Sequence, residues 1–304
     1  MERARHRWKL NQVLIEKGKA SRMEVNSLLS SFNIKLRELL DNNSCISILD
    51  YIGRFYNHSF LNSTLIYAQK PEATKVADVN TWEKIGRKVK SEADECIWVL
   101  LPKMSNMYII KETGNYLKRN EMTKDEQKVA LDKGLLEKKR VSKGYIKVPV
   151  YDISQTEGRD IQTLGANVNI SRVIKALQSI SGGLDNTDND ITSIIHDCIT
   201  ILLDKDHEEG HVGTKPTLLN GEKEQVVAGC SYIMGNCILN GVSTVDTDCI
   251  YYWIQDNKHT EDGIKSIETV FTTIVMIVNQ LIRAIEKELG LDTLCIDEDW
   301  TNIV

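Results

Sequence analysis

Apolar residues recur every three to four positions along much of this chain, which is the spacing of one face of an α-helix. Residues 24–42 show this pattern most clearly in the first half, and Ile34 falls off the apolar face beside polar Asn33 and Lys35. The same spacing predicts helices over 44–56 and 59–69, and a short helix or turn over 81–89. The second of these should end near Pro71, because the residue before a proline avoids the helical conformation.

Strand patterns follow these helices. Residues 96–101 form an apolar run that predicts a buried strand ending at Pro102, with 107–111 as its candidate hairpin partner. Residues 144–153 alternate in polarity and predict a further strand. Residues 111–143 are polar and rich in lysine, so we expect an exposed insertion that is partly helical over 124–139.

The second half of the chain is predicted to be mainly helical, with helices over 169–180, 190–203, 222–239, 247–255 and 266–289. The expected fold class is therefore α+β, with a mixed α/β N-terminal domain followed by a mainly helical one. The longest apolar run, 270–282, is too short for a membrane span and is interrupted by polar residues. We expect no membrane partner.

Charge is distributed very unevenly along the sequence. Residues 1–150 contain 28 Lys/Arg and 18 Asp/Glu, a balance of +10, whereas residues 151–304 contain 10 Lys/Arg and 25 Asp/Glu, a balance of −15. A basic half is where a polyanion would bind. The alternative is that the two halves neutralise each other across an interface, and charge alone leaves both interpretations open.

The cysteines and the N-terminal residues indicate the compartment. The seven cysteines are scattered and no pair has C-x-x-C spacing, which is typical of a reduced compartment with free thiols. The first ten residues are basic but are not followed by the apolar core of a secretion signal. We therefore expect a cytoplasmic protein.

One ordered set of residues within 56–102 resembles a known family pattern. The pattern falls on Phe60, Asn62, Leu65, Ile66, Gln69, Pro71, Ala73, Thr74, Trp82, Gly86, Arg87, Val89 and Pro102. A second motif, Asp-Ile-x-Gln-Thr-Glu-Gly, lies at 152–158. Together they resemble the N-terminal domain of the ArdC-type antirestriction proteins and the related LtrC-like proteins. The acidic stretch 91–95 departs from the basic turn usual in that family, which weakens one expected phosphate contact.

The resemblance implies a chain of three parts: a basic N-terminal arm over 1–23, a single-stranded DNA-binding domain over 24–158 and a metallopeptidase-like helical domain over 159–304. It implies that the second part binds single-stranded DNA with little sequence preference. It also implies a role in protecting or escorting transferred DNA against host restriction, with a host restriction or DNA-processing protein as a candidate partner.

A binder that ignores sequence needs cations for phosphates and flat rings for unstacked bases. The candidate rings are Tyr56, Phe60, Tyr67 and Trp82, of which we expect Phe60 and Trp82 to contribute to the core. The candidate cations are Arg54, Lys70, Lys75, Lys84, Arg87, Lys88 and Lys90. Asn62 and Gln69 lie seven residues apart on one helix face, where they could bind bases or fix a loop.

The resemblance further implies a His-Glu-x-x-His motif on an apolar helix with a later Glu as third ligand. Two histidines four residues apart on a helix can hold one zinc ion, while the Glu deprotonates its water. An intact copy, His207 to His211 with Glu208, lies in a charged, glycine-rich stretch. A blurred copy, His196-Asp197-x-x-Thr200, lies in an apolar helical pattern.

The blurred copy has the spacing that the family shows, because 28 residues separate His196 from Glu224. Asp197 would then replace the general base, and Thr200 would replace the second histidine. Two ligands, His196 and Glu224, do not make a catalytic zinc site, so we expect an eroded domain that needs no cofactor, with zinc still open. His196 could equally be a core histidine and Glu224 an ordinary surface charge.

Two alternatives stay open for the metal. A shifted zinc site would use His207, His211 and Glu224 (or Glu222), with Glu208 as base; a mixed site would combine His196 with His207 or His211. The leading functional prediction is a non-enzymatic single-stranded DNA-binding protein. The alternatives are a zinc-dependent metallopeptidase with a DNA-binding N-terminal domain, and a scaffold whose acidic half binds a basic protein or mimics DNA.

Overall fold

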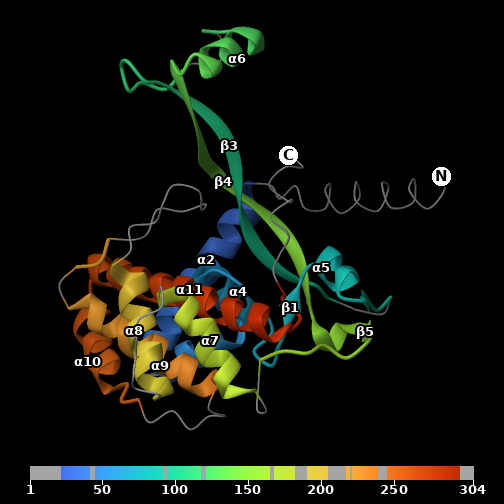
Figure 1. Cartoon of the computed structure of the whole chain (residues 1–304), viewed down its shortest axis with the longest axis vertical. Helices are drawn as coiled ribbons and strands as arrows, with labels where there is room; N and C mark the ends of the chain where they lie inside the picture. The colour runs from blue at the N-terminus through green and yellow to red at the C-terminus, as the bar shows by residue number, and fades with distance from the viewer. Residues whose placement is uncertain are drawn as a thin grey trace. The chain divides into compact units, whose positions relative to one another are not determined.

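The structure is a computed structural model of the chain (Figure 1). It describes residues 22–41, 45–91, 95–117, 121–164, 168–181, 190–204, 217–219, 221–238 and 245–294. The fold is α+β: antiparallel strands lie among helices in the first half, and the described second half beyond residue 158 is helical. The chain forms two compact units. Of the described residues, the main unit contains those within 26–99 and 149–297, and the second unit contains 22–25 and those within 100–148, a segment here called the arm.

The sequence division at residue 158 does not coincide with this boundary, because helices from both halves of the chain share the main unit. The early helices are α2 (Arg22–Asp41), α3 (Cys45–Arg54) and α4 (Phe60–Gln69). The later ones are α7 (Ile170–Ser181), α8 (Ile191–Asp204), α9 (Glu222–Ile238), α10 (Asp248–Asn257) and α11 (Glu261–Leu289). Among the contacts between early and late helices are those of α3 with α9 and of α4 with α11.

Helix α11 is the centre of this packing and also contacts α7 and α9 (Figure 1). It begins at the Thr260 cap, whose hydroxyl accepts a hydrogen bond from Gly263 N, and ends at Gly290, which has a φ of 71°. Phe271 of α11 stacks on Phe60 of α4 with ring centroids 5.2 Å apart. Of the described helices, α11 alone has the length and apolarity to cross a membrane, and 56% of its apolar window is buried inside the protein.

Short strands and a helical turn complete the main unit. Strand β1 (Val76–Ala77) pairs antiparallel with the end of β4 (Leu136–Asp152), and β2 (Arg87–Val89) pairs with β5 (Thr156–Gly158). Helix α5 (Val79–Lys84) begins at Asp78, whose carboxylate accepts hydrogen bonds from the backbone nitrogens of Asn80 and Thr81. The 3-10 helix η1 (Ile153–Gln155) joins β4 to β5.

The arm is a two-stranded ribbon made from the long strands β3 (Ile97–Ile110) and β4, with α6 (Lys124–Asp132) between them in sequence (Figure 1). Helix α6 begins with a capping box in which Thr123 and Glu126 bond each other's backbone nitrogens. The backbone nitrogen of Lys111 donates to the carbonyl of Leu135 at 3.1 Å, which closes the ribbon beside α6. Few of its described side chains are buried: Leu100, Ala130, Leu136 and Val148.

Most helices predicted from apolar spacing are confirmed, and Ile34 is exposed as expected. Two predictions in the arm are wrong. Strand β3 does not end at Pro102 and includes 107–110, so its partner is β4; proline is tolerated because β3 is an edge strand in the order β1-β4-β3. Helix α6 ends at Asp132 rather than near 139, because Gly134 takes a left-handed φ of 68° and β4 starts at Leu136.

Candidate nucleic-acid interface

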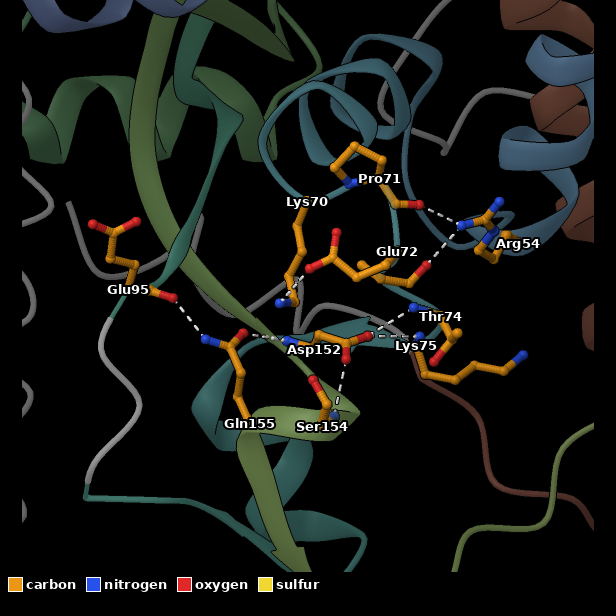
Figure 2. A network of polar contacts seen from close by, with 11 residues as sticks. Arg54, Lys70, Pro71, Glu72, Thr74, Lys75, Glu95, Asp152, Ser154 and Gln155 are labelled. Carbon is orange, nitrogen blue, oxygen red and sulfur yellow. Dashed lines mark hydrogen bonds and ion pairs between the residues drawn. The ribbon is translucent and has the colours of Figure 1, made fainter.

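The Asp-Ile-x-Gln motif builds a hydrogen-bonded anchor around Asp152 (Figure 2). One carboxylate oxygen of Asp152 accepts hydrogen bonds from the backbone nitrogens of Thr74 (2.8 Å) and Lys75 (3.2 Å). The other accepts from Ser154 N at 2.9 Å, while Asp152 N donates to Gln155 Oε1 at 2.9 Å. The motif therefore fixes the loop that follows α4.

Arg54 holds the same loop from its other side. Its Nη1 donates to the carbonyl of Pro71 at 2.7 Å, as Figure 2 shows, and to the carbonyl of Ala73 at 3.0 Å. A guanidinium has five N–H donors in a planar fork, so it can satisfy two carbonyls at once. Arg54 was a predicted phosphate ligand, and the structure gives its guanidinium a loop-fixing role.

Asn62 and Gln69, the two amides predicted to face one way on a helix, have different surroundings. Gln69 pairs with the backbone of Trp98 in both directions: Nε2 donates to the carbonyl at 2.8 Å, and Oε1 accepts from the nitrogen at 2.9 Å. It thus attaches the end of α4 to the start of β3. Asn62 is buried, so its amide is shielded from a base in solution. Of the two uses considered for these residues, the structure favours loop fixing for Gln69.

Three of the four candidate rings lie inside the main unit. Trp82 is 0% exposed, and its Nε1 donates to the carbonyl of Tyr151 at 3.0 Å. Phe60 is buried as expected, and Tyr56 is buried with its hydroxyl donating to Glu286. Stacking on a base requires an open ring face, so Tyr56 and Trp82 cannot act as platforms in this structure, because the main-unit core covers their rings.

Tyr67 is the remaining candidate ring, and it is half-buried. One face stacks on Tyr51, with ring centroids 5.0 Å apart and an interplanar angle of 18°. The Lys35 ammonium lies 5.6 Å from its centroid. Tyr67 therefore already has a ring partner and a cation partner from its own chain.

The candidate cations fall into a buried group and an exposed group. Arg87 is buried and donates to the hydroxyl and carbonyl of Thr156 at 2.8 and 3.1 Å. Lys75 is mostly buried, and desolvation lowers its pKa. Lys70 is half-buried, and its hydrogen bond to Glu72 at 2.8 Å raises its pKa. The guanidinium of Arg87 serves the β2–β5 pairing, which sequence reasoning could not separate from phosphate binding.

Three candidate lysines remain at the surface: Lys84, Lys88 and Lys90, here called the α5–β2 lysines. They come from the end of α5, from β2 and from the residue after β2. Lys90 Nζ donates to the carbonyl of Ser154 at 2.8 Å. Ammonium groups at these positions can contact phosphates without reading bases.

A buried polar cluster joins Tyr56, Lys75, Cys237 and Glu286, and the sequence did not predict it. Glu286 is fully buried in α11, and desolvation raises its pKa. Burial also raises the pKa of Cys237 to about 11. The one sequence signal is that the charged residue Glu286 lies beside apolar Ile285 in the helical pattern of α11.

The blurred metal motif lies on the surface of α8. His196 is exposed, with Nδ1 3.9 Å from a carboxylate oxygen of Asp197, and is therefore not a core histidine. The hydroxyl of Thr200 donates to the carbonyl of His196 at 3.0 Å, and Glu224 is exposed on α9. Among the described residues no group of three or more His, Cys, Asp or Glu side chains is placed to hold a metal ion. Within the described residues, the blurred copy therefore supplies no three-ligand zinc site.

The intact copy of the motif spans residues 207–211. His207, Glu208 and His211 fall outside the described residues, so the shifted and mixed sites stay predictions. Glu222, the alternative third ligand, is buried and accepts hydrogen bonds from Leu219 N (2.6 Å) and from the hydroxyl of Ser266.

Comparisons with protein-family models, with curated proteins and with solved structures find no match to this chain.

Proposed function

We propose that this chain binds single-stranded DNA with little sequence preference. The observation that carries the proposal is the number of exposed lysines in the basic half of the chain. Among the described residues they comprise the α5–β2 lysines and, in the arm, Lys103, Lys111, Lys124, Lys128, Lys133, Lys138, Lys139 and Lys143. Residues 100–148 alone contain 12 Lys/Arg and 6 Asp/Glu, a balance of +6. Phosphate neutralisation by such cations supplies most of the affinity in sequence-independent binding.

The hydrogen bonding of the main unit supports weak sequence preference. Base-edge readout uses Arg, Asn or Gln side chains that can form two hydrogen bonds to one base. Arg87 and Gln69 already make their hydrogen bonds inside the protein, and Asn62 is buried. The candidate cations that stay exposed, Lys84, Lys88 and Lys90, are lysines, which act as point charges on phosphates.

The proposal names single-stranded DNA, and not duplex DNA, because of the resemblance to ArdC-type antirestriction proteins. That resemblance also supports the biological part of the proposal, in which the protein protects or escorts transferred DNA against host restriction. A host restriction or DNA-processing protein is the further partner in this proposal.

Fluorescence anisotropy with labelled oligo-dT tests the proposal. We expect tight binding at low ionic strength, with the logarithm of the association constant falling linearly with log[salt] by about 0.7 for each phosphate contacted. The triple variant Lys84→Glu/Lys88→Glu/Lys90→Glu should bind more weakly and lower this slope by about two units.

A matched variant tests whether a loss of DNA affinity comes from the location of the substituted lysines or only from the change in net charge. Lys175→Glu/Lys223→Glu/Lys265→Glu changes the total charge by the same amount, but its three lysines lie in the acidic half. Each pairs with a carboxylate at the surface, and such exposed pairs contribute little stability. We expect this variant to keep nearly wild-type affinity. Absence of wild-type binding to oligo-dT at low ionic strength would overturn the proposed function.

A further inference from the structure

Tyr145 is an exposed aromatic residue on strand β4 of the arm. It is 42% exposed, and its side chain makes no hydrogen bond, ion pair or ring contact with another described residue. The arm contains one other tyrosine of comparable exposure, Tyr116. The arm therefore offers what the buried rings of Tyr56 and Trp82 do not, which is an aromatic face open to solvent.

Two exposed lysines precede this ring on the same strand. Lys143 lies two residues before Tyr145 and Lys139 six residues before it. At about 3.3 Å per residue, these separations are roughly 7 Å and 20 Å along the strand. Neither lysine forms an ion pair with a described carboxylate. A ring with cations at such spacings is suited to bind a single-stranded nucleic acid, because bases can stack on the ring while phosphates contact the cations.

Gly144, between Lys143 and Tyr145, leaves the backbone open at this point. Its φ is +119°, which side-chain-bearing residues rarely adopt, and nothing lies within 4 Å of where a Cβ would be. A glycine inside a strand marks either a bulge or a place where a ligand approaches the backbone closely. Here the open space beside an exposed ring is consistent with close approach of a ligand.

We propose that residues 139–145 of β4, here called the β4 grip, hold single-stranded DNA, with a base stacked on Tyr145 and phosphates on Lys139 and Lys143. This inference rests on the proposed function and assigns its principal contact to the arm. It differs from the sequence prediction, which placed the stacking rings between residues 54 and 90. Ring and cations together favour a nucleic-acid strand over the acidic half of a second copy, which would need the cations alone.

Four full-length variants test the β4 grip against fluorescein-labelled oligo-dT. Tyr145→Ala should weaken binding by roughly 5- to 150-fold, because stacking contributes about 1–3 kcal/mol per base. Tyr145→Phe keeps the ring and should bind within about twofold of wild type. Lys139→Glu/Lys143→Glu should weaken binding and lower the salt slope by about one unit or more. Tyr252→Ala removes a 64% exposed tyrosine on α10 and should leave affinity unchanged.

A second readout locates the contact directly. Oligo-dT carrying one 5-iodouracil should photo-cross-link to Tyr145, as identified by mass spectrometry of the tryptic peptides, and the same cross-link should be absent from Tyr145→Ala. Circular dichroism melts of each variant establish that the fold is kept, which we expect because the substituted side chains are exposed.

The outcomes separate this inference from the proposed function. If the wild-type protein does not bind oligo-dT at low ionic strength, the proposed function is wrong. If wild type binds but Tyr145→Ala and Lys139→Glu/Lys143→Glu bind equally well, the β4 grip alone is wrong. Equal loss of duplex and single-strand affinity in Tyr145→Ala would overturn the stacking role. Conversion of a dimer to a monomer by the lysine variant, with unchanged oligo-dT affinity, would make the arm a self-association surface and overturn the inference.

Discussion

The carboxylate of Asp152 accepts a hydrogen bond from the backbone nitrogen of Thr74 at 2.8 Å, although the two residues are 78 positions apart in the sequence. The same carboxylate accepts hydrogen bonds from Lys75 N and Ser154 N. A buried acceptor shared by three backbone donors closes the loop after α4 onto the end of β4, so the motif that begins at Asp152 has a structural role here.

Substitution of this residue should destabilise the main unit. In Asp152→Asn one oxygen becomes an NH2 group that cannot accept a hydrogen bond, so at least one part-buried backbone donor loses its partner. We expect a loss of about 1–3 kcal/mol in the free energy of unfolding, measured by urea denaturation. Asp160→Asn, which changes an exposed carboxylate nearby, is the control and should change stability little. Equal stability of the two variants would contradict the anchoring role.

Trp82 should matter for stability and not for DNA binding. Trp82→Phe keeps most of the buried ring but leaves the carbonyl of Tyr151 without its donor, which should cost about 1–2 kcal/mol. Oligo-dT affinity, measured at a temperature where the variant is fully folded, should stay within about twofold of wild type. A large loss of affinity in the folded variant would show that the indole reaches the DNA.

His58 should make stability fall on acidification. It is buried, its Nε2 bonds the carbonyl of Val76 at 3.0 Å, and desolvation lowers its pKa from 6.5 to about 4. Between these values the unfolded chain binds a proton that the folded chain does not, so stability is lost as the pH falls from 6.5 toward 4. The loss from this residue alone should be about 3 kcal/mol.

The comparison with His58→Gln isolates this effect from other titrating groups. The glutamine amide can donate to the Val76 carbonyl but has no proton to gain in this range. The free energy of unfolding of each protein is measured by urea denaturation at pH 7, 5.5 and 4.5. As the pH falls, the value for wild type should decrease more than the value for the variant. A constant difference across these pH values would rule out His58 as the cause.

Metal removal should have no effect on DNA binding. His196 and Glu224 supply at most two ligands, and the hydroxyl of Thr200 is bonded to its own helix. We expect far less than one zinc ion per chain after dialysis, and unchanged melting temperature and oligo-dT affinity in EDTA. One zinc ion per chain that is lost in His211→Ala would instead establish the shifted site and reopen the peptidase alternative, which Glu208→Gln would then test.

The sequence alone determined most of the helices, because apolar spacing is a local property that the backbone expresses directly. Residues 24–42 and 266–289 carry that spacing, and α2 and α11 bury the expected faces. The basic character of the first half is likewise a property of composition. Glu286 marks the limit of this local reading, because nothing in its neighbourhood along the chain shows that Tyr56 will approach it.

The tertiary structure decided which polar and aromatic residues are available to a ligand. Arg54, Gln69 and Trp82 have the chemistry of a nucleic-acid interface, and their partners lie 17, 29 and 69 positions away along the chain. A side chain that binds a distant carbonyl and one that binds a phosphate look the same in sequence, because both need a donor. Only the path of the chain brings those carbonyls close, and it leaves Tyr145 open on the arm.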